Sequence, residues 1–159
     1  MNLTVLACGS IKEGYLREAC REYGKRLSAY CKLNVIEVKD EKTPDDASSA
    51  MERKIKDAEG ERLLSKLPPD AFLVALSIDG KRYSSEEFSR IHEAWEVKSR
   101  GKLYFVIGGS LGLSDAVLSR ADERMSFSDL TFPHQLMRVI LLEQVYRSYR
   151  IRNHQPYHK

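Results

Sequence analysis

The sequence predicts an α/β fold in which a parallel sheet is covered by helices on both faces. Short apolar segments of strand length alternate along the chain with longer segments whose apolar residues recur at helical spacing. Two of the strand segments, residues 71–78 and 103–107, are almost continuously apolar, which is typical of strands covered on both sides. A chain of 159 residues without repeats or a linker is expected to form one domain, residues 1–159.

The first half of the chain is expected to contain two strands and two helices. Residues 3–8 predict an apolar strand that ends at Gly9, and apolar side chains at helical spacing from Leu16 to Tyr30 predict an amphipathic helix. Residues 33–38 predict the second strand, followed by a polar loop. A second helix is expected over residues 51–67, with a kink or break near Gly60, where the apolar pattern slips.

The second half continues the alternation. After the strand at residues 71–78, Ser84 and Glu87 form a capping-box pattern that predicts the start of a helix, and His92 is expected on the exposed side of that helix. The strand at residues 103–107 precedes a short helix capped by Ser114 and a short strand at residues 125–127. The final helix, residues 134–152, is apolar on most sides, which favours a dimer packed through it.

Cysteine content and hydropathy limit the class of protein. The three cysteines are an odd number and form no Cys-x-x-Cys pair, so neither a disulfide framework nor a zinc site is expected. No segment approaches the roughly 20 apolar residues of a membrane helix, and the first apolar run is too short for a signal peptide. We therefore expect a cytoplasmic protein that binds no metal and no membrane.

Positive charge is concentrated at the C-terminal end. The net charge is +3, yet residues 133–159 hold five basic residues and one acid, so the rest of the chain is close to neutral. Three of the four histidines, His134, His154 and His158, lie in the same segment. Arginines and tyrosines are interleaved there, which suits nucleic acid because cations bind phosphates and rings stack on unpaired bases. An anionic partner is therefore expected at this end.

Three loops are expected to meet at one edge of the sheet, where ligands of open parallel sheets bind. They lie at residues 77–81, 108–113 and 128–133. The loop beginning at Gly108 has the spacing G-G-x-x-G, which matches neither the Rossmann fingerprint nor the P-loop. Its glycines would either bring backbone amides close to a flat ligand or simply form a tight turn. Phe127 and Phe132 would either wall a planar ring such as adenine or belong to the core.

The same glycine-rich loop also matches G-x-S-x-G, the nucleophile elbow of serine hydrolases, with Ser110 as the nucleophile. His134 and an aspartate from the intervening segment would complete the order Ser, Asp, His. Against this alternative, the chain is short for that fold and has no His-Gly-Gly segment upstream. The helix also begins near Ser114, whereas an elbow places its nucleophile at the start of the helix.

Three motifs together resemble one protein family. They are FVIGGSLGL at residues 105–113, LTFPH at residues 130–134 and PYHK at residues 156–159. In this order, and over the whole chain, they resemble the bacterial 23S rRNA pseudouridine N3-methyltransferases, the RlmH family of the SPOUT class. The resemblance implies a knotted α/β domain, a homodimer, S-adenosylmethionine bound in a bent shape, and methylation of N3 of a pseudouridine in 23S rRNA within the ribosome.

The resemblance also implies which residues bind the cofactor. Carried over by position, they are Leu76, Gly108, Phe127, Ser128, Asp129, Leu130, Thr131 and Phe132. Beyond the resemblance, we expect the backbone of Gly109 and Gly112 to line the same pocket. All of these residues lie in or beside the three loops expected at the edge of the sheet.

Catalysis requires that N3 of the pseudouridine lose its proton, and histidine is suited to accept it near neutral pH. We expect His158 to be the general base and Tyr157 to position or stack on the target base, with His134 as the second candidate base. The phosphates of the RNA would be bound by Arg138, Arg147, Arg150 and Lys159. A modest net charge implies weak affinity for naked RNA, so assembled ribosomes or large subunits are the expected substrate.

A third function class is compatible with the residues. A non-enzymatic ribosome-binding factor would use the basic end to bind RNA and would not need S-adenosylmethionine.

Overall fold

The computed structural model describes all residues from Met1 to Lys159 as a five-stranded parallel sheet with helices on both faces, which confirms the predicted fold class. The strand order is β2-β1-β4-β3-β5. In chain order the elements are β1 (Asn2–Cys8), α1 (Gly14–Leu27), β2 (Lys32–Val38), α2 (Ser49–Ser65), β3 (Phe72–Lys81), α3 (Ser85–Ser99), β4 (Leu103–Ile107), α4 (Asp115–Arg120), β5 (Glu123–Met125) and α5 (His134–Arg152).

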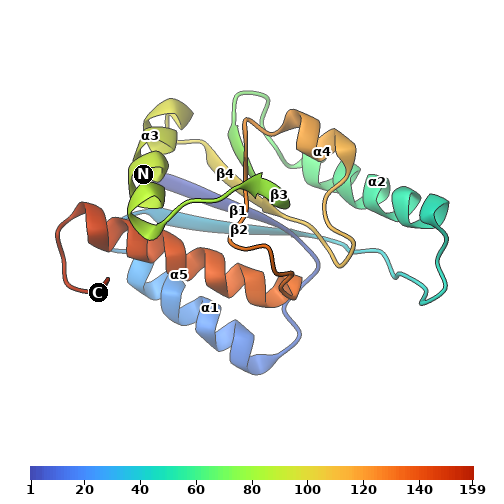
Figure 1. Ribbon diagram of the computed structural model, residues 1–159, viewed down its shortest axis with the longest axis horizontal. Helices are drawn as coiled ribbons and strands as arrows, with labels where there is room; N and C mark the ends of the chain where they lie inside the picture. Colours follow the sequence, from blue (N-terminus) through green and yellow to red (C-terminus); the bar gives the residue numbers. More distant parts are fainter.

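The sheet separates two hydrophobic clusters. Because successive side chains of a strand point to opposite faces, Val5 and Val74 pack with α1, α3 and α5, whereas their neighbours Leu6 and Leu73 pack with α2 and α4. The same division of the helices can be followed in Figure 1. Strands buried on both faces explain the continuous apolar runs in the sequence. No helix combines the length and the apolar character needed to cross a membrane.

Two of the predicted helix starts are confirmed. Ser84 Oγ accepts a hydrogen bond from the Glu87 amide at 3.1 Å, and the Glu87 carboxylate accepts one from the Ser84 amide at 2.7 Å, so the capping box is complete. Ser114 caps α4 by accepting from the Val117 amide at 3.3 Å.

Helix α2 is continuous, so the break predicted near Gly60 is wrong. A Cβ atom at Gly60 would lie 2.2 Å from Ser114 Oγ and 3.2 Å from a methyl carbon of Val117. Glycine at this position therefore allows α4 to pack closely against α2. The apolar pattern of α2 is interrupted there because its backbone, and not a side chain, makes the contact.

The predicted exposure of His92 is also wrong, since its side chain is 0% exposed. His92 Nδ1 lies 2.8 Å from Ser148 Oγ of α5, and the ring stacks on Phe88. Burial lowers the pKa of His92 to about 3. The imidazole is thus a neutral part of the contact between α3 and α5.

The end of β3 wraps around the end of β5. Met125 is in register with both Leu76 and Lys81, because β3 bulges between these two positions, and the Ser126 amide donates to the Lys81 carbonyl at 3.0 Å. A Cβ atom at Gly80 would lie 2.5 Å from the Met125 carbonyl carbon, so only glycine permits this approach. The last strand accordingly ends at Met125, two residues before the predicted end at Phe127.

Helix α5 runs back from the carboxyl ends of the strands, and the C-terminal tail follows at the other end of this helix (Figure 1). Its side chains Leu141, Leu142, Val145 and Tyr149 are buried against the sheet, α1 and α3. Much of the apolar surface of this helix is therefore covered within one protomer.

Candidate active site

The three predicted loops and the first turn of α5 enclose a cavity of about 790 Å³ at the carboxyl ends of the strands. The inner wall is apolar and buried, with Ile107, Leu113 and Met125 among its side chains. Ten sequence-predicted site residues line the cavity: Leu76, Gly108, Gly109, Gly112, Phe127, Ser128, Leu130, Thr131, Phe132 and His134. The volume lies within the range of about 300–1,000 Å³ that is usual for small-molecule sites.

The glycine-rich loop is folded tightly on itself. The Gly112 amide donates to the Gly109 carbonyl at 3.1 Å, and Gly112 has a φ of 88°, in the left-handed region that favours glycine. A Cβ atom at Gly108 would lie 2.6 Å from the carbonyl carbon of Gly112. The three glycines of this loop therefore present only backbone to the cavity.

Serine side chains hold the loop between β5 and α5. Ser126 Oγ donates to the Ser128 carbonyl at 2.8 Å, and Ser128 Oγ accepts from the Leu130 amide at 3.0 Å. Both Phe127 and Phe132 are partly exposed and line the cavity, so neither is fully taken up by the core. These contacts give the loop a defined shape without a regular element.

Asp129 does not line the cavity, in contrast to the other residues of its loop. Its side chain is 78% exposed and pairs with Arg82. The carboxylate of Asp129 therefore points away from the cavity, and contact of this residue with the cofactor stays a prediction.

The cavity contains one imidazole and one carboxylate, those of His134 and Asp79. Burial is the main cause that lowers the pKa of His134, and the nearby Asp40 carboxylate opposes it. His134 is therefore mostly neutral at pH 7 and able to accept a proton. Asp79 lies in a predicted loop but was not singled out, because one acid in a polar turn carries no motif.

The hydrolase alternative lacks its catalytic hydrogen bonds. No hydrogen bond joins Ser110 to His134 or His134 to a carboxylate, and α4 begins at Asp115, after Ser114 as N-cap. Ser110 therefore does not occupy the sharp strand-to-helix turn that defines a nucleophile elbow.

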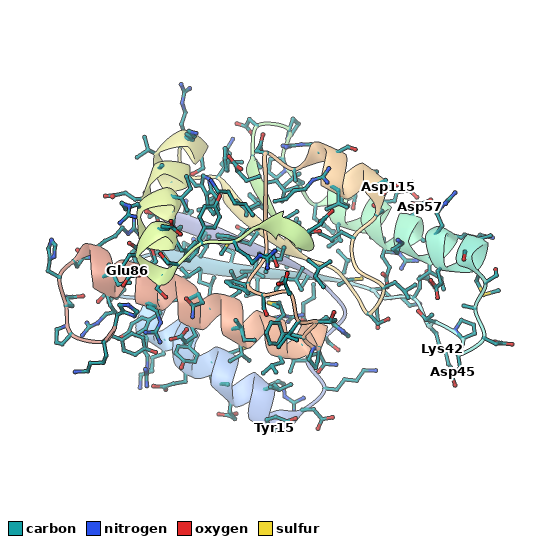
Figure 2. The ribbon with its side chains drawn as sticks, viewed as in Figure 1. Tyr15, Lys42, Asp45, Asp57, Glu86 and Asp115 are labelled. Atoms are coloured by element: carbon teal, nitrogen blue, oxygen red, sulfur yellow. The ribbon has the colours of Figure 1, made fainter.

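The C-terminal tail folds back on α5 and α3. His158 lies between two helices, with Nδ1 3.0 Å from Arg147 Nη1 and Nε2 2.9 Å from Glu86 Oε1. Tyr157 donates its hydroxyl hydrogen to Glu143 at 3.0 Å. Figure 2 shows Glu86 at the start of α3, beside α5. The sequence held no signal that Glu86 contacts His158, because the two residues are 72 positions apart along the chain.

Tyr157 and His158 do not line the cavity of their own protomer. Arg147, which contacts His158, follows His134 by 13 residues along α5, a rise of about 20 Å. Within one chain, therefore, His134 at the cavity lies far from Tyr157 and His158 in the tail, although all three are predicted catalytic residues.

The basic residues of α5 and the tail differ in accessibility. Arg147 and Arg150 are partly exposed and contact aromatic rings, Arg147 over Tyr157 and Arg150 over Tyr146, while Lys159 is exposed. This leaves cationic and aromatic groups together on the surface near the C-terminus.

Arg138 is 4% exposed, and it pairs with Glu37 and donates to the Gly9 carbonyl at 3.1 Å. Its guanidinium links α5 to the ends of β1 and β2, so in this structure Arg138 lies apart from the exposed cations that are predicted to bind RNA.

No group of three or more His, Cys, Asp or Glu side chains is arranged to hold a metal ion. The polar groups that line the cavity are backbone amides, hydroxyls, one imidazole and one carboxylate.

Comparison with known proteins identifies the family. The family described as "Predicted SPOUT methyltransferase" matches residues 1–158. Two relatives named ribosomal RNA large subunit methyltransferase H, from Clostridium acetobutylicum and from Clostridium botulinum strain Langeland, are 54% and 55% identical to the chain over all 159 residues and the full length of each relative. A third, from Clostridium botulinum strain Eklund 17B, is 52% identical over the same span. The chain belongs to the SPOUT methyltransferase family.

Proposed function

We propose that the protein transfers a methyl group from S-adenosylmethionine to N3 of a pseudouridine in 23S rRNA. One observation carries the proposal: in a chain whose full-length relatives are named rRNA large subunit methyltransferases, the three loops close one cavity at the carboxyl ends of the strands. The serine hydrolase alternative is not supported, because Ser110 lacks its partners.

The residues of the cavity fit this cofactor. The apolar inner wall suits the flat adenine ring, and the backbone of Gly108 and of residues 127–132 offers hydrogen-bonding groups to its edge. A Cβ atom at Gly108 has no room, so this stretch must stay bare backbone. Bound S-adenosylmethionine would supply an already activated methyl group, so the chain mainly has to align donor and acceptor.

Proton removal from N3 requires a base beside the cavity. Within one protomer, His134 is the imidazole that lines the cavity, and its lowered pKa keeps it unprotonated near neutral pH. His158, our first candidate, can reach a cavity only from a second copy of the chain. We propose a two-fold dimer in which the tail of each protomer completes the site of the other, with Tyr157 and His158 presented to the target base.

The partner of the tail surface is the rRNA of an assembled particle. Arg147, Arg150 and Lys159 would bind phosphates, and the tyrosines among them would stack on unpaired bases. Since the net charge is only +3, contacts with the folded particle must add to this attraction. We place this activity in the cytoplasm, where ribosomes act.

Titration of the purified protein with S-adenosylmethionine and with S-adenosylhomocysteine tests the proposal. We expect both to bind with one site per protomer, and labelled methyl transfer to ribosomes to exceed transfer to naked 23S rRNA. Absence of binding would favour a non-enzymatic ribosome-binding factor. Labelling of Ser110 by an activated phosphonate would favour a hydrolase.

A further inference from the structure

Asp79 supplies the only carboxylate among the side chains that line the cavity. Its side chain is exposed at the end of β3, within the bulge that precedes Lys81. The Ser77 hydroxyl donates a hydrogen bond to Oδ1 of Asp79, which fixes the orientation of the carboxylate and leaves Oδ2 available. This hydrogen bond is the largest cause that lowers the pKa of Asp79, so the group is ionised at neutral pH.

The basic side chains of neighbouring segments contact groups other than Asp79. Arg82 pairs with Asp129, and Lys81 lies over the ring of Tyr83 at 5.2 Å from its centroid. Arg124 donates to the Leu118 carbonyl at 3.2 Å; its charge is a minor cause that lowers the pKa of Asp79, but the two side chains form no ion pair. An ionised carboxylate thus faces the cavity without a cationic partner from the chain.

The cavity is apolar at its inner wall and open at its rim. Ile107 and Met125 are buried on the inner side, whereas Ile78 beside Asp79 is 56% exposed and Leu130 is 71% exposed. Burying a charged ammonium group is costly unless it is paired, while a flat ring gains from burial. A ligand with an aromatic ring at one end and an amino-acid group at the other will therefore place its charged end at this rim.

We propose that Asp79 is a binding residue for the α-ammonium group at the methionine end of the cofactor. The inference rests on the proposed function, since it takes S-adenosylmethionine as the occupant of the cavity. The rim formed by Ser77 and Asp79 would then recognise the amino-acid end of the ligand. Ligands with an α-ammonium group would bind more tightly there than nucleosides without one.

Isothermal titration of three ligands tests the proposal. S-adenosylmethionine and S-adenosylhomocysteine carry the ammonium group, whereas 5′-methylthioadenosine keeps the adenine, ribose and thioether but lacks the amino acid. In Asp79→Asn we expect about ten-fold weaker binding of the first two ligands, the size of one charge-assisted hydrogen bond near solvent, and unchanged binding of the third. Asp57→Asn is the matched control, because Asp57 is an exposed aspartate on α2, outside the cavity (Figure 2).

The outcomes separate this proposal from the proposed function. If the wild-type protein binds none of the three ligands, the proposed function fails. If it binds them and Asp79→Asn weakens all three equally, the carboxylate contacts the ribose, and the assignment to the ammonium group is overturned. Unchanged affinity of Asp79→Asn for all three ligands also overturns it. Because Asp79 is exposed and asparagine has the same shape, a matching melting temperature will show that the variant is folded.

Discussion

Gly108 lies where the backbone of the glycine-rich loop leaves no room for a side chain. A methyl group there would lie 2.6 Å from the carbonyl carbon and 2.7 Å from the carbonyl oxygen of Gly112, and neither atom is on a flexible side chain. The loop that lines the cavity must therefore move if any side chain is added.

We expect Gly108→Ala to weaken binding of S-adenosylmethionine at least ten-fold, because the displaced loop would carry its backbone amides out of position. Isothermal titration measures the effect. Gly24→Ala is the control, since its nearest neighbour would be a Leu33 methyl group at 3.7 Å and alanine favours the helix by about 0.5–1 kcal/mol. Equal affinity of Gly108→Ala and wild type would show that this loop does not bind the cofactor.

His158→Ala is expected to lower turnover far more than cofactor affinity, because the side chain lies outside the cofactor cavity of its own protomer and is proposed to act on the substrate. Single-turnover methyl transfer to ribosomes, with cofactor titration in parallel, separates the two effects. Turnover equal to wild type would remove His158 from the mechanism.

The positions of some individual side chains in the fold could be predicted from the sequence, and those of others could not. The glycines and phenylalanines of the two loops follow strands, so their position at the carboxyl edge could be predicted from topology. Arg138 could not be, because its partner Glu37 lies on a strand about a hundred residues earlier and turns a basic residue inward.

Helices α3 and α5 are joined by a buried polar network. His92 contacts Ser148, and Glu96 accepts hydrogen bonds from Tyr149 and from Arg152, the latter at 2.7 Å. A sequence pattern treats polar positions as exposed, which is why the pattern predicts an exposed His92. Only the packing of α5 against them supplies the hydrogen-bond partners that make burial possible.

This network predicts a pH-dependent stability. The pKa of His92 is lowered to about 3 in the folded chain, so between about pH 6.5 and pH 3 the unfolded chain binds a proton here that the folded chain does not. The free energy of unfolding should therefore fall with decreasing pH, by at most about 1.4 kcal/mol per pH unit from this group.

Urea denaturation from pH 6.5 to pH 4.5 measures this dependence in the wild type and in His92→Gln, which cannot titrate. We expect a steeper loss in the wild type than in the variant, whatever the absolute stability of the variant. Parallel curves would mean that His92 is protonated in the folded state.

In the whole molecule, the cavity and the C-terminal tail lie toward opposite ends of α5 (Figure 1). Tyr157 and His158 contact the second half of α5 and the start of α3, far from the loops that close the cavity. The motifs are in the right order along the chain, but order in sequence does not determine which copy of the chain completes a site. A site shared between two protomers accounts for both motifs.

Mixed dimers test the shared site. Gly108→Ala impairs the cavity and leaves the tail intact, and His158→Ala does the reverse. If the tail acts across the dimer, co-expression of the two variants should restore about a quarter of wild-type activity, because half of the dimers are mixed and each has one complete site. If the tail acts within its own protomer, the mixture will be as inactive as either variant alone.

We propose that this cavity serves methyl transfer to N3 of a pseudouridine in 23S rRNA. The most direct measurement is mass mapping of 23S rRNA after incubation of the protein and S-adenosylmethionine with ribosomes that lack the modification. We expect one added methyl group, on N3 of a single pseudouridine, and its loss with Gly108→Ala. A methyl group on another nucleotide, or no methylated product from ribosomes and large subunits, would contradict it.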